Sequence, residues 1–387
     1  MTPEARARQN IDALLEQAGW MICDLAQANI HGALGVAIRE FPLNPGHGFA
    51  DYLLYVNGKA CGVIEAKKEG VPLKGVEVQS GRYAQGLPAA LPAWRRPLPF
   101  LFESTGAETQ FTNGLDPQPR SRRVFAFYRP ELLVQWLAYQ PAIGQGAAND
   151  EPQTFLGRMR EMPPLRTEWG QGGASYKLWP AQIQAVQNLE KSLAANKPRA
   201  LIQMATGSGK TFTAISFIYR LIKFAGARRV LFLVDRGNLG RQTKKEFDQY
   251  ASPYNAFKFG EEFIVQHLQG KQVDTSARVV ICTIQRMYSM LRGKELPAEA
   301  DEESTEGLES LFKDPEPLRY NPAFPIELFD IVVTDEAHRS IYNLWRQVLE
   351  YYDAYLIGLT ATPNKQTFGF FNQNLVMEYG HTQAVAD

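Results

Sequence analysis

The residues from Gln203 to Thr211, read Gln-Met-Ala-Thr-Gly-Ser-Gly-Lys-Thr, have the types and spacing needed to hold a polyphosphate. Glycines let backbone N–H groups converge on phosphate oxygens, a lysine supplies positive charge, and a threonine hydroxyl can ligate magnesium. Met204 stands where the general Walker A pattern has its first glycine, so an ordinary glycine-rich turn remains an alternative. The candidate nucleotide-binding residues are Thr206, Gly207, Ser208, Gly209, Lys210 and Thr211.

A second set of chemical groups, Asp335-Glu336-Ala337-His338, follows the apolar run from Leu328 to Thr334. This placement is typical of a DEAH-type Walker B motif. Asp335 would hold Mg²⁺ through water, Glu336 would polarise the water that attacks the γ-phosphate, and His338 completes the motif. The same four residues on a surface helix would carry no such meaning. Their position after a strand and downstream of the first motif predicts an ATP and Mg²⁺ site.

A third set, Asp51 with Glu65 and Lys67, matches the D…E-x-K pattern of PD-(D/E)-x-K nucleases, with Ala50 in place of the proline. Two carboxylates can bind Mg²⁺, which lowers the pKa of bound water. The lysine can orient that water or stabilise charge on the phosphate. On these three residues alone, a solvated strand end with charged side chains remains the alternative.

Gln79 and Tyr83 lie one helical turn apart on a helix that we predict from Leu73 to Gln85, so they share a face. The pair could brace the metal site or contact a DNA phosphate. A surface glutamine beside a half-buried tyrosine is the simpler alternative.

The elements that must position this third set form a small α/β domain over residues 1–140. Asn57-Gly58 is a strong hairpin signal and would bring Asp51 and Glu65 to neighbouring positions. The predicted strands are Gly35–Phe41, Phe49–Val56, Ala60–Ala66, Phe100–Gly106 and Arg123–Phe127, and the predicted helices are Met1–Gly19, Leu73–Gln85 and Pro130–Tyr139.

Residues 141–174 are polar and rich in glycine and proline, which predicts a linker, interrupted by a possible helix at Thr154–Met162. Residues 175–387 then alternate strand and helix. Near-continuous apolar runs indicate strands buried on both faces of a parallel sheet, and ligands bind at the carboxyl ends of such strands. These runs are Ala200–Ile202, Arg229–Val234, Ala277–Thr283, Leu328–Thr334 and Ala354–Leu359, with helices from Leu178 to Ala194 and from Thr213 to Ile222.

Polar residues end several of these strands. Thr360-Ala361-Thr362 would couple the nucleotide site to movement of a partner domain, and Arg236 and the Thr283 hydroxyl could meet a nucleic-acid backbone. Simple capping remains the alternative for each. We interpret the acidic insertion between Glu295 and Pro322 as a solvated surface loop without activity.

Composition sets the broad class. Lys+Arg and Asp+Glu balance at 41 each, so nucleic-acid binding must come from a local patch. Cys23, Cys61 and Cys282 are too scattered for a disulfide framework or a zinc site, which indicates a reducing cytoplasm. The N-terminus lacks a signal-peptide core and no run is apolar enough to span a bilayer, so we expect no membrane association.

Together, these motifs resemble the restriction, or motor, subunit of type I restriction enzymes over essentially all 387 positions. In that family a nuclease domain carries the D…E-x-K set and then Q-x-x-x-Y, and a superfamily 2 DEAH-box translocase follows. The matching nuclease residues are Asp51, Glu65, Lys67, Gln79 and Tyr83. The matching translocase positions are Gln182 for the Q motif, Gly207–Thr211 for motif I, Asp335–His338 for motif II and Thr360–Thr362 for motif III.

The resemblance implies a PD-(D/E)xK nuclease-like domain at 1–140, a linker, and a RecA-like P-loop domain with a parallel sheet at 175–387. It implies an ATP-dependent type I site-specific deoxyribonuclease that uses ATP and Mg²⁺. The implied partners are double-stranded DNA and the modification (methyltransferase) and specificity subunits. Only one RecA-like lobe fits after Ser175, so we expect this chain to be the N-terminal part of such a subunit.

Two other readings stay open. One is a superfamily 2 helicase or remodelling ATPase whose N-terminal domain only binds nucleic acid; Mg²⁺-dependent nicking by the first domain would argue against it. The other is a degenerate DNA-binding or partner-binding module, which nucleotide affinity without turnover would favour.

Overall fold

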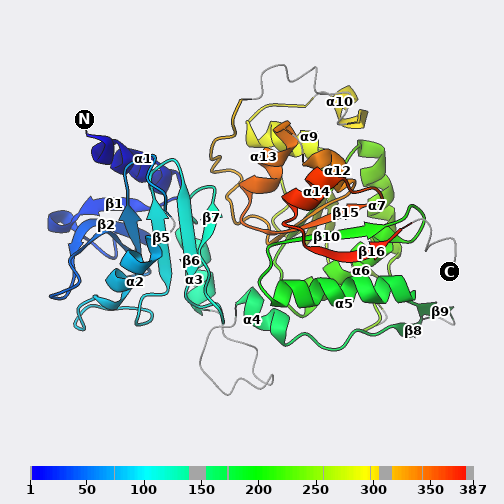
Figure 1. The fold of residues 1–387 in the computed structure, drawn as a ribbon, viewed down its shortest axis with the longest axis horizontal. Helices are drawn as coiled ribbons and strands as arrows, with labels where there is room; N and C mark the ends of the chain where they lie inside the picture. Colours follow the sequence, from blue (N-terminus) through cyan, green and yellow to red (C-terminus); the bar gives the residue numbers. More distant parts are fainter. Residues whose placement is uncertain are drawn as a thin grey trace. The chain divides into compact units, whose positions relative to one another are not determined.

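The computed structural model describes residues 2–380, except residues 74, 139–153, 172–173, 256, 297, 305–315 and 342. The chain divides into two compact units. The first comprises Met1–Thr154 with Tyr320–Glu327, and the second comprises Phe155–Arg319 with Leu328–Asp387. Each unit contains one seven-stranded sheet, drawn in Figure 1.

The first unit is built on a mixed sheet whose strands follow one another in chain order, β1 to β7. Two neighbouring pairs, β1 with β2 and β4 with β5, are parallel, and the other neighbours are antiparallel. The elements are α1 (Pro3–Gln17), β1 (Met21–Asp24), η1 (Leu25–Gln27), β2 (Gly35–Pro42), β3 (Phe49–Val56), β4 (Lys59–Ala66), α2 (Glu77–Gln85), β5 (Phe100–Ser104), β6 (Thr109–Asn113), β7 (Arg122–Val124) and α3 (Pro130–Ala138).

The predicted hairpin is confirmed. Asn57 and Gly58 have φ angles of 48° and 72°, the left-handed backbone that a two-residue type I′ turn requires. Tyr52 pairs with Ile64, so the residues next to them, Asp51 and Glu65, lie at the same end of the hairpin.

Two boundaries in the first unit differ from the sequence prediction. The helix expected from Leu73 begins at Glu77, because Gly75 has a φ of 91°, which no right-handed helix accommodates. The last strand is shorter than Arg123–Phe127 and follows β6, which we did not predict. Residues 320–327, far along the chain, also pack in this unit, where the buried Glu327 pairs with Arg129 at 2.8 Å.

The second unit contains the predicted parallel sheet, in the order β12-β13-β11-β14-β15-β10-β16 with every neighbouring pair parallel. Its strands are β10 (Arg199–Met204), β11 (Val230–Val234), β12 (Val265–His267), β13 (Val279–Thr283), β14 (Ile331–Thr334), β15 (Tyr355–Thr360) and β16 (Leu375–Tyr379). A separate hairpin joins β8 (Glu168–Gln171) and β9 (Ala174–Lys177).

Helices cover both faces of this sheet. Figure 1 shows α5 and α6 on one side and α9, α12, α13 and α14 on the other. β11 and β13 are buried at every position, as expected for strands covered on both faces. The helices are α4 (Phe155–Arg160), α5 (Pro180–Ala194), α6 (Lys210–Lys223), α7 (Gly237–Gln249), α8 (Phe259–Glu262), α9 (Ile284–Leu291), α10 (Ala298–Glu302), α12 (Ala337–Ser340), α13 (Asn343–Tyr351) and α14 (Lys365–Phe370).

The second half of the segment predicted as a linker is structured. It contains α4 and the hairpin of β8 with β9, while residues 139–153 lie outside the described part of the chain. α4 contributes Met159 to the core of the second unit, alongside residues of α5 and α6.

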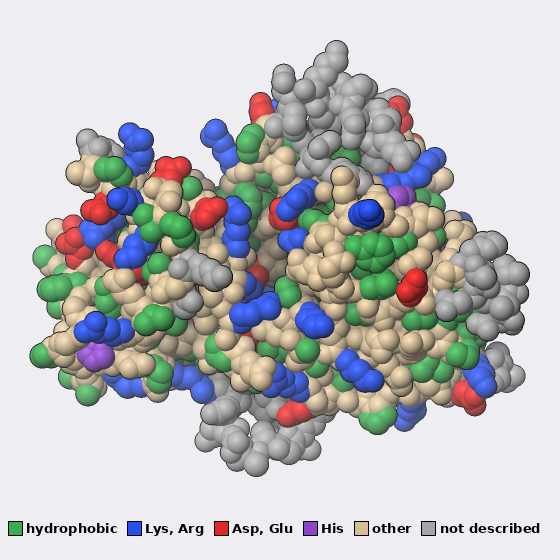
Figure 2. All heavy atoms as spheres, in the orientation of Figure 1, with side chains coloured by type: hydrophobic (Ala, Val, Ile, Leu, Met, Phe, Trp, Pro, Cys, Tyr) green, Lys and Arg blue, Asp and Glu red, His purple; other side chains and the backbone are tan. Residues whose placement is uncertain are grey.

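Among the described residues, no helix is both long and apolar enough to cross a membrane. Basic and acidic side chains are interspersed over the face drawn in Figure 2, in keeping with the balanced composition.

Candidate active sites

The predicted phosphate loop lies between β10, which ends at Met204, and α6, which begins at Lys210. Gly207 and Gly209 have φ angles of 81° and 79°, so the loop uses backbone that favours glycine. A Cβ atom at Gly209 would lie 2.5 Å from Nε2 of Gln182, too close for any side chain without a shift. This strand, glycine loop and helix N-terminus form the arrangement that cradles phosphates in other proteins.

The remaining loop residues differ in exposure. Ser208 is buried and its hydroxyl donates to the Ala205 carbonyl at 2.7 Å, which closes the turn. Thr206 is exposed and Thr211 is half-buried. Gln182, in the first turn of α5, is buried, and its Oε1 accepts the Trp179 N–H at 2.9 Å. Gln182 therefore caps α5 while its amide group lies against the phosphate loop.

The D-E-A-H residues follow β14 directly, at the carboxyl edge of the sheet. Burial raises the pKa of Asp335 to about 6, and the nearby Lys210 opposes that rise. Burial therefore favours the protonated form of this carboxyl, while nearby positive charge favours the ionised form. Glu336 has a φ of 48°, unusual for a residue other than glycine, and its Oε1 lies 3.4 Å from the Lys210 ammonium.

His338 connects the ends of β14 and β15. Its Nδ1 lies 3.0 Å from Oγ1 of Thr360 and 3.4 Å from Oε2 of Glu336. The Thr360 hydroxyl is buried and also accepts the N–H of Thr362 at 3.2 Å. The residues predicted as motifs II and III thus lie in one hydrogen-bonded group.

The strand-end residues predicted to meet nucleic acid divide into two cases. Arg236 is exposed and lies 3.4 Å from the Asp235 carboxylate. Thr283 is buried, and its hydroxyl donates to Asp301 of the acidic insertion. The interpretation of the whole insertion as a solvated loop is therefore wrong at Asp301, which is buried because Thr283 and Arg286 satisfy its carboxylate.

The five residues of the candidate nuclease set lie together in the first unit. Lys67 Nζ is 2.5 Å from Oε1 of Glu65 and donates to Oε1 of Gln79 at 3.0 Å. Gln79 in turn donates from Nε2 to the hydroxyl of Tyr83 at 2.7 Å. Asp51 joins the group through the backbone, because its Oδ2 accepts the Ala66 N–H at 2.8 Å.

Glu65 has the properties of a metal ligand. Its side chain is 3% exposed, and within the described part of the chain its Oε2 is buried with no hydrogen-bond partner. Burial raises the pKa of Glu65, with Asp51 adding to the rise and Lys67 opposing it. An unpaired buried carboxylate oxygen is costly unless a cation satisfies it. The described residues contain no group of three or more His, Cys, Asp or Glu side chains that could hold a metal ion.

A helix orients the polar pair. α2 carries Gln79, Ser80 and Tyr83, and the buried Ser80 hydroxyl donates to Glu103 on β5. Glu103 is the neighbour of Glu65 across the parallel β4–β5 pair. This contact anchors α2 against the strand beside the candidate site.

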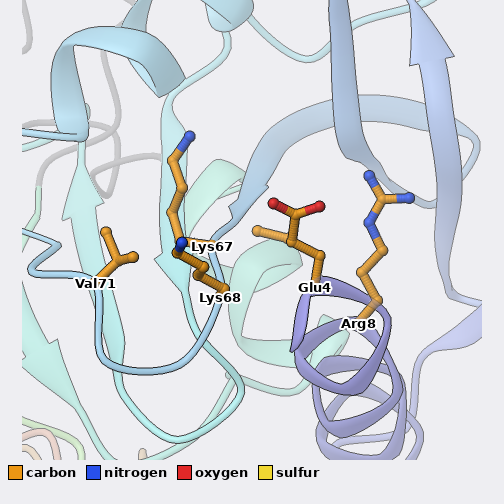
Figure 3. Close-up of a pocket in the computed structure, with 6 residues that line it drawn as sticks. Glu4, Arg8, Lys67, Lys68 and Val71 are labelled. Atoms are coloured by element: carbon orange, nitrogen blue, oxygen red, sulfur yellow. The ribbon is translucent and has the colours of Figure 1, made fainter. Parts of the chain in front are cut away.

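Arg8 also contacts the candidate nuclease set, which the sequence did not predict. Its guanidinium lies 2.6 Å from Oδ1 of Asp51 and 2.5 Å from Oε1 of Glu40. Figure 3 shows Arg8 and Glu4 projecting from α1 beside the segment that carries Lys67, Lys68 and Val71, and these residues with Ala66 line a pocket. The amphipathic pattern of α1 placed Arg8 on a helix but held no signal for its partner, which is 43 residues away.

The second unit is a RecA-like P-loop domain. Its sheet is parallel, and β15 lies between the strand that precedes the phosphate loop and the strand that precedes the D-E-A-H residues. The first unit is a separate α/β domain that carries the carboxylate and lysine set.

Comparison with known proteins agrees with this architecture. Residues 175–365 match the family model described as type III restriction enzyme, res subunit, and residues 31–106 match that of the type I restriction enzyme EcoKI endonuclease subunit second domain. The EcoKI endonuclease subunit of Escherichia coli strain K12 is 26% identical over 451 aligned residues, covering 99% of this chain and 34% of the relative. The EcoAI endonuclease subunit of Escherichia coli is 26% identical over 323 residues, covering 79% and 33%.

The chain is similar to type I restriction enzyme endonuclease subunits over almost its whole length. It spans about a third of the length of these curated relatives. A solved fragment assigned to the HsdR subunit of a type I restriction enzyme from Vibrio vulnificus YJ016 has 22% identity and a TM-score of 0.35, covering 100% of this chain and 61% of that one.

Proposed function

We propose that the first unit cleaves double-stranded DNA with Mg²⁺ and that the second unit binds ATP and Mg²⁺ to drive movement along the DNA. The chain would act in the cytoplasm together with modification and specificity subunits. The relatives are endonuclease subunits by name, which supports the reaction class. The observation that carries the proposal is the hydrogen-bonded group of five predicted residues around the unpaired Oε2 of Glu65.

In the second unit, backbone N–H groups from Gly207 to Lys210 would bind phosphate oxygens, and the Lys210 ammonium would contact the β and γ phosphates. Thr211 and Asp335 would hold the metal, and Glu336 would orient the attacking water. Mg²⁺, when bound, supplies positive charge that offsets the charge on the phosphates. Thr206, Ser208, Gln182 and His338 would complete the nucleotide site.

In the first unit, Asp51 and Glu65 would hold the metal and Lys67 would orient water towards the scissile phosphate. Gln79 would hold the Lys67 ammonium through its carbonyl oxygen, and Tyr83 would hold the Gln79 amide. The Lys67 ammonium already donates hydrogen bonds to Glu65 and Gln79, so its side chain is held in one orientation. This reduces the conformational entropy that the side chain would lose when substrate binds.

The test uses the subunit assembled with its modification and specificity partners on circular plasmid DNA. Glu65→Gln and Asp51→Asn keep size and shape but remove the charge that holds the metal. We expect both to abolish DNA cleavage while DNA-dependent ATP hydrolysis continues. Asp24→Asn is the matched control, because its carboxylate is 63% exposed in the same unit and pairs with Arg39.

Cleavage at the parental rate by either carboxylate variant would rule out this nuclease site. The chain would then fit a helicase or remodelling ATPase whose first domain binds nucleic acid without cutting it.

A further inference from the structure

Residues 300–304, Ala-Asp-Glu-Glu-Ser, form an acidic segment that ends α10 and contacts α7, α9 and the strand ends before them. β11 and β13 are neighbours in the parallel sheet, and their carboxyl ends lead into α7 and α9. Ligands of such sheets approach from this edge. The acidic segment thus lies at an edge where a ligand is expected.

Asp301 makes the most buried of these contacts. Its Oδ1 accepts the Thr283 hydroxyl, and its Oδ2 lies 2.9 Å from the Arg286 guanidinium. The side chains of Arg286 and Asp301 are 13% and 12% exposed, so solvent screens this pair weakly.

The rest of the segment extends the contact. Glu302 lies 2.7 Å from the guanidinium of Arg241 on α7. Gln285 donates from Nε2 to the Glu303 carbonyl at 3.0 Å. The Ser304 hydroxyl donates to Oδ2 of Asp235 at 3.0 Å. Each residue from 301 to 304 therefore bonds a group at the ends of β11 and β13 or at the start of α7 and α9.

The side chains that contact the acidic segment are of types that also bind nucleic-acid phosphates. Arginine guanidinium groups, threonine hydroxyls and glutamine amides are among the groups that contact the DNA backbone in protein–DNA complexes. Carboxylate and phosphate oxygens accept the same donors, and arginine binds both. Asp301 and Glu302 thus occupy donors of the kind that also bind phosphate oxygens.

We propose that the acidic segment is an internal substitute for DNA phosphates that keeps duplex DNA from the surface formed by Arg241, Thr283 and Arg286. The proposal rests on the proposed function, because it takes double-stranded DNA as the ligand of this unit. DNA binding requires residues 300–304 to leave this surface, so the segment weakens the binding of duplex DNA.

The test measures the affinity of the full chain for a short fluorescein-labelled DNA duplex by anisotropy at low ionic strength. In the double variant Asp301→Asn with Glu302→Gln, the competing charges are removed while the side-chain shapes are kept. We expect the Kd to fall by about 5- to 30-fold, the range that one or two kcal/mol represents. The single variant Glu302→Gln changes a side chain that is 46% exposed, and we expect a smaller decrease in the same direction.

The matched control is the double variant Glu295→Gln with Glu303→Gln. It removes the same net charge from the same insertion, but Glu295 pairs with Lys271 and Glu303 reaches Gln285 only through its backbone carbonyl. Its Kd should stay within about twofold of the parental value, the effect of removing exposed charges.

Each other outcome overturns the proposal in a distinct way. Equal tightening in the test and control variants would indicate a bulk charge effect. Unchanged affinity in the Asp301 and Glu302 variants, with DNA bound by all proteins, would reject the phosphate substitute and leave the proposed function standing. If no protein bound duplex DNA, this inference would fail, and the plasmid cleavage test would still decide the proposed function.

Discussion

The ammonium of Lys210 lies 3.4 Å from Oε1 of Glu336, although 126 residues separate them in the chain. Lys210 begins α6 after β10, and Glu336 follows β14, two strands away in the sheet with β15 between them. The parallel order places both strand ends at one edge, so the lysine predicted to bind phosphate and the glutamate predicted to orient water meet there. In the proposed function these two groups would act on the γ-phosphate and on the water that attacks it.

Lys210→Ala should weaken binding of Mg²⁺–nucleotide strongly while leaving the fold intact. Hydrogen bonds to charged groups contribute about 1.5–3 kcal/mol. We therefore expect an increase in Kd of roughly 10- to 100-fold, since every 1.4 kcal/mol is tenfold. Titration with a fluorescent ATP analogue measures it. Lys245→Ala, which removes an exposed lysine of α7, should bind normally; parental affinity in folded Lys210→Ala would refute the phosphate-binding role.

Arg8→Ala should lower the Mg²⁺ concentration that gives half-maximal DNA cleavage in the assembled enzyme. The Arg8 guanidinium competes with the metal for the Asp51 carboxylate, at 2.6 Å. Because the Arg8 side chain is 39% exposed, the effect is limited to about 1 kcal/mol, or roughly fivefold. A Mg²⁺ titration of cleavage measures it, with Arg123→Ala, whose pair with Glu108 is exposed, as control. A shift to higher Mg²⁺ would mean that Arg8 supports the metal site instead.

Arg220→Ala should destabilise the second unit by about 3–5 kcal/mol, the cost of breaking a buried ion pair. Arg220 on α6 is 1% exposed and pairs with Glu190 of α5 at 2.6 Å, and it also donates to the Pro163 carbonyl at 2.6 Å. Removing it leaves these acceptors without a partner.

Equilibrium unfolding in urea, followed by circular dichroism, measures the change in free energy. The exposed pair of Lys244 with Asp248 on α7 provides the comparison, and Lys244→Ala should cost less than about 1 kcal/mol. Equal effects of the two substitutions would show that the Arg220 network does not hold α5 against α6.

The sequence alone determined the features that depend on local chemistry. Asn57-Gly58 predicts the hairpin because both residues tolerate left-handed backbone, and β11, β13 and β15 are recognisable because strands buried on both faces are continuously apolar. The phosphate loop and the D-E-A-H residues can also be recognised from the sequence, because each is a short, contiguous stretch directly after its strand.

Only the tertiary structure decided the contacts that join distant segments. The edge strands β12 and β16 each contain polar residues and so lack a continuous apolar run, and they gain their identity from pairing with β13 and β10. Arg8 reaches Asp51, and Asp301 reaches Thr283 and Arg286, because packing brings their elements together. From the sequence, such charged side chains are expected to be solvated. Only the folded chain shows which opposite charge or hydrogen-bond donor each of them contacts.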